Sequence, residues 1–127
     1  MSVGITGVDF VALQVRDVEA AAVFCEKHLG LRRTPASPPG AVVFATTPIP
    51  FAVREVLPGT DLDSGRPGSG VALWFTTPDA VQLHEQLIAD GVEVLSPAKP
   101  SPFGPMFTFV GPEGYVLTAY GPAPQGD

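Results

Sequence analysis

The sequence predicts an α+β protein built from two tandem βαβββ modules. Three observations predict this class: an internal repeat, a helix signal at the same place in each copy, and short apolar runs separated by Pro and Gly. The run VALQV at residues 11–15 returns 60 positions later as VALWF at 71–75. The pair Glu19-Ala20 returns as Asp79-Ala80 at the same offset. Each module is therefore expected to contain one strand, one helix and about three further strands.

The remaining elements follow from helix ends and loops. The first helix is expected to end near Gly30 and the second near Gly91, because glycine commonly terminates helices. Pro- and Gly-rich segments predict loops at residues 34–40, 58–70 and 96–105. The apolar runs between these loops predict strands at about 40–46, 50–57, 105–110 and 115–121.

Length and composition predict one domain. A chain of 127 residues with 45% hydrophobic and 16% charged residues can bury a substantial core. We expect the first module at about 5–57, a linker at 58–69, the second module at about 70–122 and a C-terminal tail at 123–127.

Charge and composition disfavour several function classes. The formal net charge of −6 argues against a nucleic-acid partner, and it favours a cationic or neutral ligand or simply maintains solubility. No apolar stretch has the length of a membrane span, and residues 1–10 lack the pattern of a signal peptide, so we expect a cytoplasmic protein without a membrane partner. The single cysteine, Cys25, is interpreted as a small buried hydrophobic residue.

Three stretches taken together suggest a family. They are VDFVALQVRD at residues 8–17, GVALWF at 70–75 and GPEGYVL at 111–117. Their order and spacing resemble the vicinal oxygen chelate superfamily, which includes glyoxalase I, extradiol dioxygenases, fosfomycin resistance enzymes and bleomycin resistance proteins. The resemblance covers residues from about 8 to 120. It implies a curved mixed sheet with a concave ligand cleft, helices on the outside, and a homodimer.

The same resemblance locates the metal-ligand positions of the family. Metal-using members carry a His near the start of the first strand of each module, and these positions fall on Phe10 and Gly70, which cannot bind a metal. A further ligand lies on the last strand of each module. These positions fall on Thr118 and on Arg54, or on Glu55 if the register differs by one residue, which would turn its side chain to the opposite face.

Histidine composition gives an independent argument against a metal. The chain has two histidines, His28 and His84, and both fall inside the predicted helices. Zinc, nickel and iron usually need three or more converging N, O or S ligands, often with His among them. We therefore expect no metal and no other cofactor.

Strand alternation predicts which side chains face the cleft. Alternate residues of the two repeat strands should pack against the helices: Val11, Leu13, Val15, Val71, Leu73 and Phe75. The candidate ligand-binding residues lie on the opposite face or on the Pro-rich loop: Phe10, Gln14, Phe44, Arg54, Trp74, Thr76, Phe103, Met106, Thr108, Thr118 and Tyr120.

Trp74 is the leading candidate among them. Its equivalent in the first module is Gln14, so the fold itself does not require an aromatic residue at this position. One interpretation is a flat platform on which a planar ligand stacks. The other is a large side chain that fills a gap at a dimer interface.

Other candidates also allow two interpretations. Phe10 forms an apolar wall of the cleft or simply fills it. Arg54 places a hydrogen-bonding fork in the cleft, or it pairs with a neighbouring carboxylate. Phe103 and Met106 lie where a lid is expected, but they equally suit hydrophobic closure of the fold.

By analogy with bleomycin resistance proteins, we expect non-catalytic binding and sequestration of a small hydrophobic or planar antibiotic, which would give drug self-resistance. Glycopeptide, quinone and enediyne ligands all remain open. The alternative is a metal-independent enzyme that acts on an aromatic or polyketide-type molecule, with Arg54, Thr118, Tyr120 or Glu55 as candidate groups. A metal-dependent lyase or dioxygenase is disfavoured.

Overall fold

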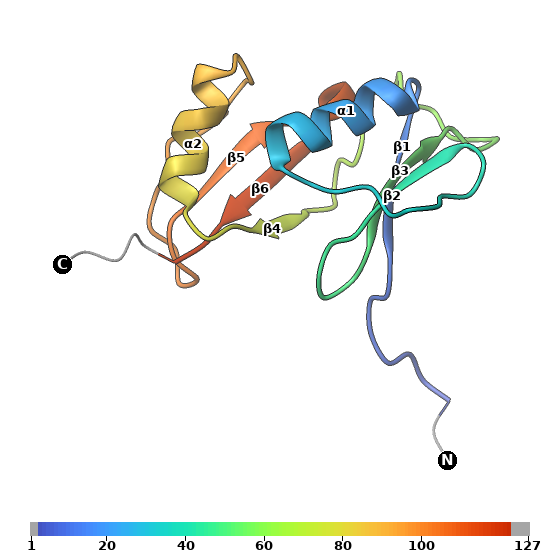
Figure 1. Ribbon diagram of the computed structural model, residues 1–127, viewed down its shortest axis with the longest axis horizontal. Helices are drawn as coiled ribbons and strands as arrows, with labels where there is room; N and C mark the ends of the chain where they lie inside the picture. The colour runs from blue at the N-terminus through green and yellow to red at the C-terminus, as the bar shows by residue number, and fades with distance from the viewer. Residues whose placement is uncertain (1–2, 123–127) are drawn as a thin grey trace. The chain divides into compact units, whose positions relative to one another are not determined.

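The computed structural model describes residues 3–122. The chain divides into two compact units, residues 1–60 and 61–127 (Figure 1). The boundary falls inside the linker that the sequence predicts. None of the helices in residues 3–122 has the length and apolar content that crossing a bilayer requires.

The first unit is a three-stranded mixed sheet with one helix. Its elements are β1 (Val11–Val15), α1 (Val18–Leu29), β2 (Ala41–Phe44) and β3 (Phe51–Glu55). The strand order is β1-β3-β2, with β1 parallel and β2 antiparallel to β3. The parallel pair follows from the helical crossover, since parallel neighbours need a long connection.

Helix α1 begins and ends with recognisable caps. The Asp17 side chain accepts a hydrogen bond from the Ala20 amide at 3.0 Å, and Gly30 adopts the left-handed conformation, φ 70°, after the last turn. The helix buries Ala21, Ala22 and Cys25. These small side chains allow it to pack closely against the sheet.

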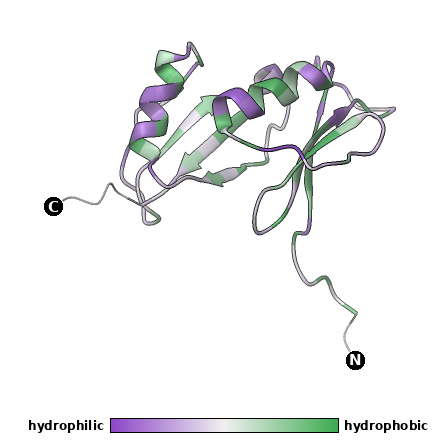
Figure 2. Ribbon diagram, viewed as in Figure 1, coloured by the Kyte–Doolittle hydropathy of each residue, from purple (hydrophilic) through white to green (hydrophobic). Residues whose placement is uncertain are grey.

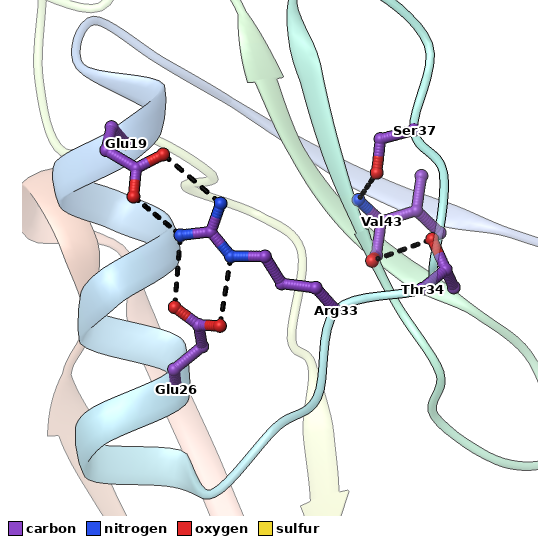
Figure 3. A network of polar contacts seen from close by, with 6 residues as sticks. All are labelled: Glu19, Glu26, Arg33, Thr34, Ser37 and Val43. Carbon is purple, nitrogen blue, oxygen red and sulfur yellow. Dashed lines mark hydrogen bonds and ion pairs between the residues drawn. The ribbon is translucent and has the colours of Figure 1, made fainter.

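Arg33 ties the segment after α1 back to the helix (Figure 3). Its guanidinium donates to Glu19 at 2.6 Å and to Glu26 at 2.9 Å. The next residue continues towards the sheet, because the Thr34 amide donates to the carbonyl oxygen of Val43 at 2.8 Å. The ion pairs lie at the surface, so they orient this segment more than they stabilise the core.

The second unit repeats this topology. Its elements are β4 (Trp74–Thr76), α2 (Ala80–Ala89), β5 (Met106–Val110), a 3₁₀ turn (Pro112–Gly114) and β6 (Val116–Tyr120). The strand order is β4-β6-β5, with β4 parallel and β5 antiparallel to β6. The α+β class and the tandem repeat of one module are confirmed, and each unit has three regular strands.

The additional strand that each module was expected to contain is irregular. In the second unit, residues 93–99 run beside β5. The Leu95 amide donates a hydrogen bond to the Thr108 carbonyl at 2.8 Å. Lys99 and Met106 exchange two backbone hydrogen bonds of 2.9 and 2.8 Å. Pro97 lies within this segment and has no amide hydrogen to donate. The edge therefore pairs at isolated positions instead of along a continuous strand.

Each unit has its own core between its helix and one face of its sheet. Figure 2 shows mostly hydrophobic strands, whereas the helices carry hydrophilic turns as well. The buried residues of the first core include Leu13, Val15, Val42, Phe44, Phe51 and Val53. Those of the second include Ala80, Leu87, Phe107, Phe109, Leu117 and Ala119.

Of the six predicted core residues, Leu13 and Val15 are buried, Val11, Leu73 and Phe75 are half-buried, and Val71 is exposed. Val71 is 67% exposed, and β4 spans only Trp74–Thr76. Val71 is exposed because the backbone that precedes it is not extended. Gly68 and Gly70 have φ values of 74° and 92°, and the Val71 amide donates a hydrogen bond to the Gly68 carbonyl. The chain is still turning at Val71, so this expectation was wrong.

Candidate functional site

The second sheet has one face covered by α2 and one that this helix does not cover. His84 of α2 packs edge-on against Phe107, with ring centroids 5.1 Å apart, which identifies the covered face. Thr108 follows Phe107 in β5, so its side chain points to the other side. We call this second side the open face.

Strand register places six candidate residues together on the open face. Trp74 pairs with Thr118 and Thr76 with Tyr120 across parallel strands. Across β5 and β6, Thr108 lies opposite Thr118, and Met106 lies opposite Tyr120. Directly paired residues project from the same side of a sheet. The open face thus consists of Trp74, Thr76, Met106, Thr108, Thr118 and Tyr120, together with Val110 and Val116.

Three aromatic rings form a cluster on this face. Trp74 contacts Tyr120 with ring centroids 5.5 Å apart and Phe103 at 6.1 Å, and Phe103 lies 6.3 Å from Tyr120. All three pairs are edge-to-face, the arrangement that ring quadrupoles favour. Trp74 nevertheless remains 43% exposed and Phe103 67% exposed. The aromatic cluster of Trp74, Phe103 and Tyr120 therefore presents apolar ring surface to solvent.

A hydrogen-bonded turn holds Phe103 against the strands. The Gly104 amide donates to the Ser101 carbonyl at 3.1 Å, which closes a four-residue turn with Pro102 at its second position. The Ser101 hydroxyl accepts from the Phe103 amide at 3.1 Å and donates to the Gly104 carbonyl. These bonds fix the backbone on both sides of Phe103, so its ring is held before any ligand arrives.

The end of this turn sits directly on the chain that follows β6. A Cβ on Gly104 would overlap the carbonyl oxygen of Gly121, and Gly104 has φ +110°, which side chains rarely adopt. The Gly121 amide donates to Pro105 at 3.3 Å. Only glycine permits this close backbone approach.

Three threonines, Thr76, Thr108 and Thr118, share the open face with the aromatic cluster. Thr118 is buried, with 6% exposure, whereas Thr76 is exposed. The Thr108 hydroxyl lies 3.2 Å from that of Ser96. Sequence reasoning missed Ser96 and Ser101, because nothing in a Pro-rich segment indicates which serine will bond to the neighbouring backbone.

In the first unit, Gln14 and Arg54 share one face. They are paired across the parallel strands β1 and β3, so their side chains project from the same side. Leu57 donates its amide to the Gln14 side chain at 2.8 Å, and Arg54 Nε donates to the Glu55 carbonyl at 3.3 Å. Gln14 pairs with Arg54 as Trp74 pairs with Thr118. Arg54, not Glu55, is therefore the first unit's equivalent of Thr118 on the last strand, and Glu55 projects to the other face.

Two further candidates of the first unit lie elsewhere. Phe44 is fully buried and stacks on Phe51, its partner across β2 and β3, at 6.2 Å. Since Phe51 alternates with Ala52 and Arg54, Phe44 points into the helix-packed core, and its expected place on a binding face is corrected. Phe10 precedes β1 and is 47% exposed.

The residues at the family's metal positions do not fit a metal. Within residues 3–122, no three His, Cys, Asp or Glu side chains gather closely enough to hold one. Both histidines contact aromatic rings. The ring centroids of His28 and Phe24 lie 4.9 Å apart, and His84 packs on Phe107.

The Cys25 thiol is unsuited to nucleophilic chemistry. Burial, with a smaller contribution from the neighbouring Glu26, raises its pKa to about 12. A thiol in such an environment stays protonated near neutral pH, whereas the thiolate is the reactive form. Cys25 is a core residue, as the sequence predicts.

Two units of the same topology, each with a helix on one face of a three-stranded mixed sheet, define the class of tandem α+β repeat proteins. The chain matches the family model of the Glyoxalase/Bleomycin resistance protein/Dioxygenase superfamily over residues 7–118, and it belongs to this superfamily. The superfamily contains both enzymes and non-enzymatic binding proteins. No curated protein matches the chain significantly in sequence.

Several solved structures share the fold. The antibiotic binding protein TnmS3 from Streptomyces sp. CB03234 has a TM-score of 0.75 at 23% identity, covering 96% of this chain and 100% of that one. A glyoxalase-related enzyme from Fulvimarina pelagi has a TM-score of 0.72 at 25% identity, covering 92% and 88%. A glyoxalase/bleomycin resistance protein/dioxygenase from Nocardioides has a TM-score of 0.70 at 21% identity, covering 99% and 89%.

Proposed function

We propose that this protein binds and sequesters a small planar antibiotic without chemical change, and so gives resistance to it. The observation that carries the proposal is the aromatic cluster of Trp74, Phe103 and Tyr120, which stays exposed although its rings contact one another. Exposed aromatic side chains on a rigid support are typical of sites that bind flat apolar molecules. The antibiotic-binding neighbour TnmS3 is consistent with the same use of the fold.

The size of the exposed ring surface sets what stacking contributes. Trp74 and Phe103 together leave roughly 200 Å² open, which corresponds to about 5 kcal/mol of apolar burial if a ligand covers all of it. Micromolar binding requires about 8 kcal/mol. Polar groups must therefore add to stacking, and the hydroxyls of Thr76 and Tyr120 on the same face suit that role.

We also propose that the protein forms a homodimer. Val3, Ile5 and Val8, which precede β1, are between 73% and 96% exposed. They lead into β1, which lies at an edge of its three-stranded sheet and can accept another strand. A second copy of the chain would cover these exposed apolar side chains. Light scattering coupled to gel filtration, which measures the mass of the particle in solution, tests whether the protein is a dimer.

A metal-independent enzyme is the second candidate. The residues of β4, β5 and β6 include no Asp, Glu, His or Lys, so these strands supply hydroxyls but no ordinary general base. Binding therefore fits the open face better than proton transfer does.

We further propose that the protein acts in the cytoplasm.

The deciding experiment uses the single tryptophan as the reporter. Purified protein with its metal content measured is titrated with neutral and charged planar antibiotics, quinones and enediynes among them, while Trp74 fluorescence is followed. Each compound is then recovered and analysed by mass spectrometry. Quenching at low micromolar concentration with the compound intact supports sequestration; an altered compound supports the enzyme, and no saturable quenching overturns both.

A further inference from the structure

The geometry points to a more specific ligand class: a planar aromatic molecule with a negatively charged group, held by Lys99 while its rings lie on the aromatic cluster. This inference rests on the proposed function, because it describes the ligand of the same face. It differs from the sequence-based expectation of a cationic or neutral ligand. Lys99 lies in the edge segment beside β5, within the stretch that the sequence predicts as a Pro-rich loop.

Backbone pairing places Lys99 on the open face. Lys99 and Met106 exchange two hydrogen bonds, from the Lys99 amide to Met106 at 2.9 Å and from the Met106 amide to Lys99 at 2.8 Å. Two residues that exchange both bonds lie directly opposite each other, and their side chains leave the same side of the sheet. Met106 in turn lies opposite Tyr120 on the open face. Lys99 thus belongs to the row of Met106, Tyr120 and Thr76.

The distance between Lys99 and Tyr120 along this row suits a ligand made of fused rings. Neighbouring strands are about 4.8 Å apart, so the Cα atoms of Lys99 and Tyr120, two strands apart, are separated by roughly 10 Å. The Lys99 side chain is long and exposed, and its ammonium can approach the edge of a ligand that lies over Met106. Rings stacked near Tyr120 and Trp74 would then carry their charged substituent towards Lys99.

The charged residues near the open face favour an anionic ligand. No Asp or Glu occurs in β4, β5 or β6, and Lys99 makes no ion pair within the described residues. The net charge of −6 is distributed over the whole chain, and salt screens charges beyond about 8 Å at physiological ionic strength. The nearest cation, not the net charge, should therefore decide which ligand charge is preferred. A carboxylate or phenolate would gain a charge-assisted hydrogen bond there.

The test compares two ligands of the same shape: 9,10-anthraquinone-2-carboxylate and its neutral carboxamide. Affinities are measured at pH 7 by quenching of Trp74. We expect the wild type to bind the carboxylate about tenfold more tightly, as a hydrogen bond to a charged group contributes. The K99Q variant should lose this preference and bind both compounds with the affinity of the carboxamide. Raising NaCl should reduce the wild-type preference.

The chain offers a matched control, because its only other lysine is Lys27, in the last turn of α1. The K27Q variant has the same change of net charge and should retain the carboxylate preference. Equal affinities in the wild type, or a preference that survives in K99Q, would overturn the inference and leave the proposed function standing. Binding of neutral antibiotics but neither anthraquinone would also overturn it. If no compound binds at all, both proposals fail together.

Discussion

The indole of Trp74 and the phenol ring of Tyr120 contact each other edge to face, with centroids 5.5 Å apart and planes at 66°. They occupy diagonal positions on the neighbouring strands β4 and β6, because Trp74 pairs with Thr118 and Thr76 with Tyr120. Diagonal neighbours on a sheet are within reach of aromatic side chains. The contact therefore follows from register, and it sets the position of the binding surface that we propose.

Removal of the Trp74 ring should weaken ligand binding without unfolding the protein. Trp74→Ala is expected to lower affinity by about tenfold or more, because the ring supplies much of the apolar area that a planar ligand covers. Affinity is measured by calorimetry, since the variant has no tryptophan. Ile88→Ala, at a 55% exposed position on α2, is the control and should bind normally. An equal loss in both variants would argue against the stacking role.

Two phenylalanines of the second unit should separate stability from binding. Phe107 is fully buried, so Phe107→Ala should lower the free energy of unfolding by about 3–5 kcal/mol. Phe103 is 67% exposed, so Phe103→Ala should lower it by about 1 kcal/mol or less while weakening binding. Urea denaturation of both variants measures the difference. A large loss of stability in Phe103→Ala would assign this ring to the fold instead of to the ligand.

Gly104 should be far less tolerant of substitution than Gly59. Both have positive φ, +110° and +90°, but a Cβ on Gly59 meets nothing within 4 Å, whereas one on Gly104 meets the backbone of Gly121. Gly59→Ala should cost about 1 kcal/mol from its backbone conformation alone. Gly104→Ala should cost at least about twice that, because the backbone must move as well. Thermal unfolding of the two variants compares these costs; equal shifts would mean that the turn is not held as described.

The ion pairs of Arg33 should make stability depend on acid. The hydrogen bond from Arg33 lowers the pKa of the exposed Glu19 below its usual value of 4.5. Stabilisation by this pair is therefore present at neutral pH and is lost as the pH falls through the lowered pKa. Glu19→Gln should reduce the melting temperature slightly at pH 7 and not at pH 2. Glu85→Gln, at an exposed position on α2, is the control, and a deficit in Glu19→Gln that persists at pH 2 would contradict the ion-pair explanation.

The Cys25 thiol should be unreactive in the folded protein. It is buried, and its pKa is raised to about 12, so its thiolate is scarce at pH 8. A disulfide reagent such as DTNB should react only as fast as the first unit opens, and at once in urea. Fast reaction without denaturant would show that α1 does not cover the thiol.

The regular elements could be predicted because their signals are local. Asp17 and Asp79 cap the two helices through bonds to amides three residues later, and Gly30 ends the first helix. Alternation along single strands also placed Trp74, Thr118 and Tyr120 on one face. Each of these features depends on residues within a few positions of one another, so one sequence is sufficient to predict it.

The errors have two origins: the register between strands, and a backbone conformation that apolar alternation does not reveal. Phe44 packs in the core because it pairs with Phe51, and this register between two strands is not visible in either segment alone. Val71 was placed in the core because the apolar alternation did not reveal that the chain was still turning at Gly68 and Gly70. Lys99 reaches the open face only through its pairing with Met106 across an irregular edge that includes Pro97, and no local pattern indicates this pairing.

The sequence by itself determined the repeat, the helix caps, the apolar alternation of the strands and the absence of suitable residues at the metal positions of the family. Tertiary structure decided the register that aligns Arg54 with Gln14, the turn that holds Phe103 against Trp74, and the row that joins Lys99 to Tyr120. The physical reason is that caps and periodicity arise from backbone geometry over a few residues. Pairing between strands instead depends on how whole segments share hydrogen bonds and bury their side chains.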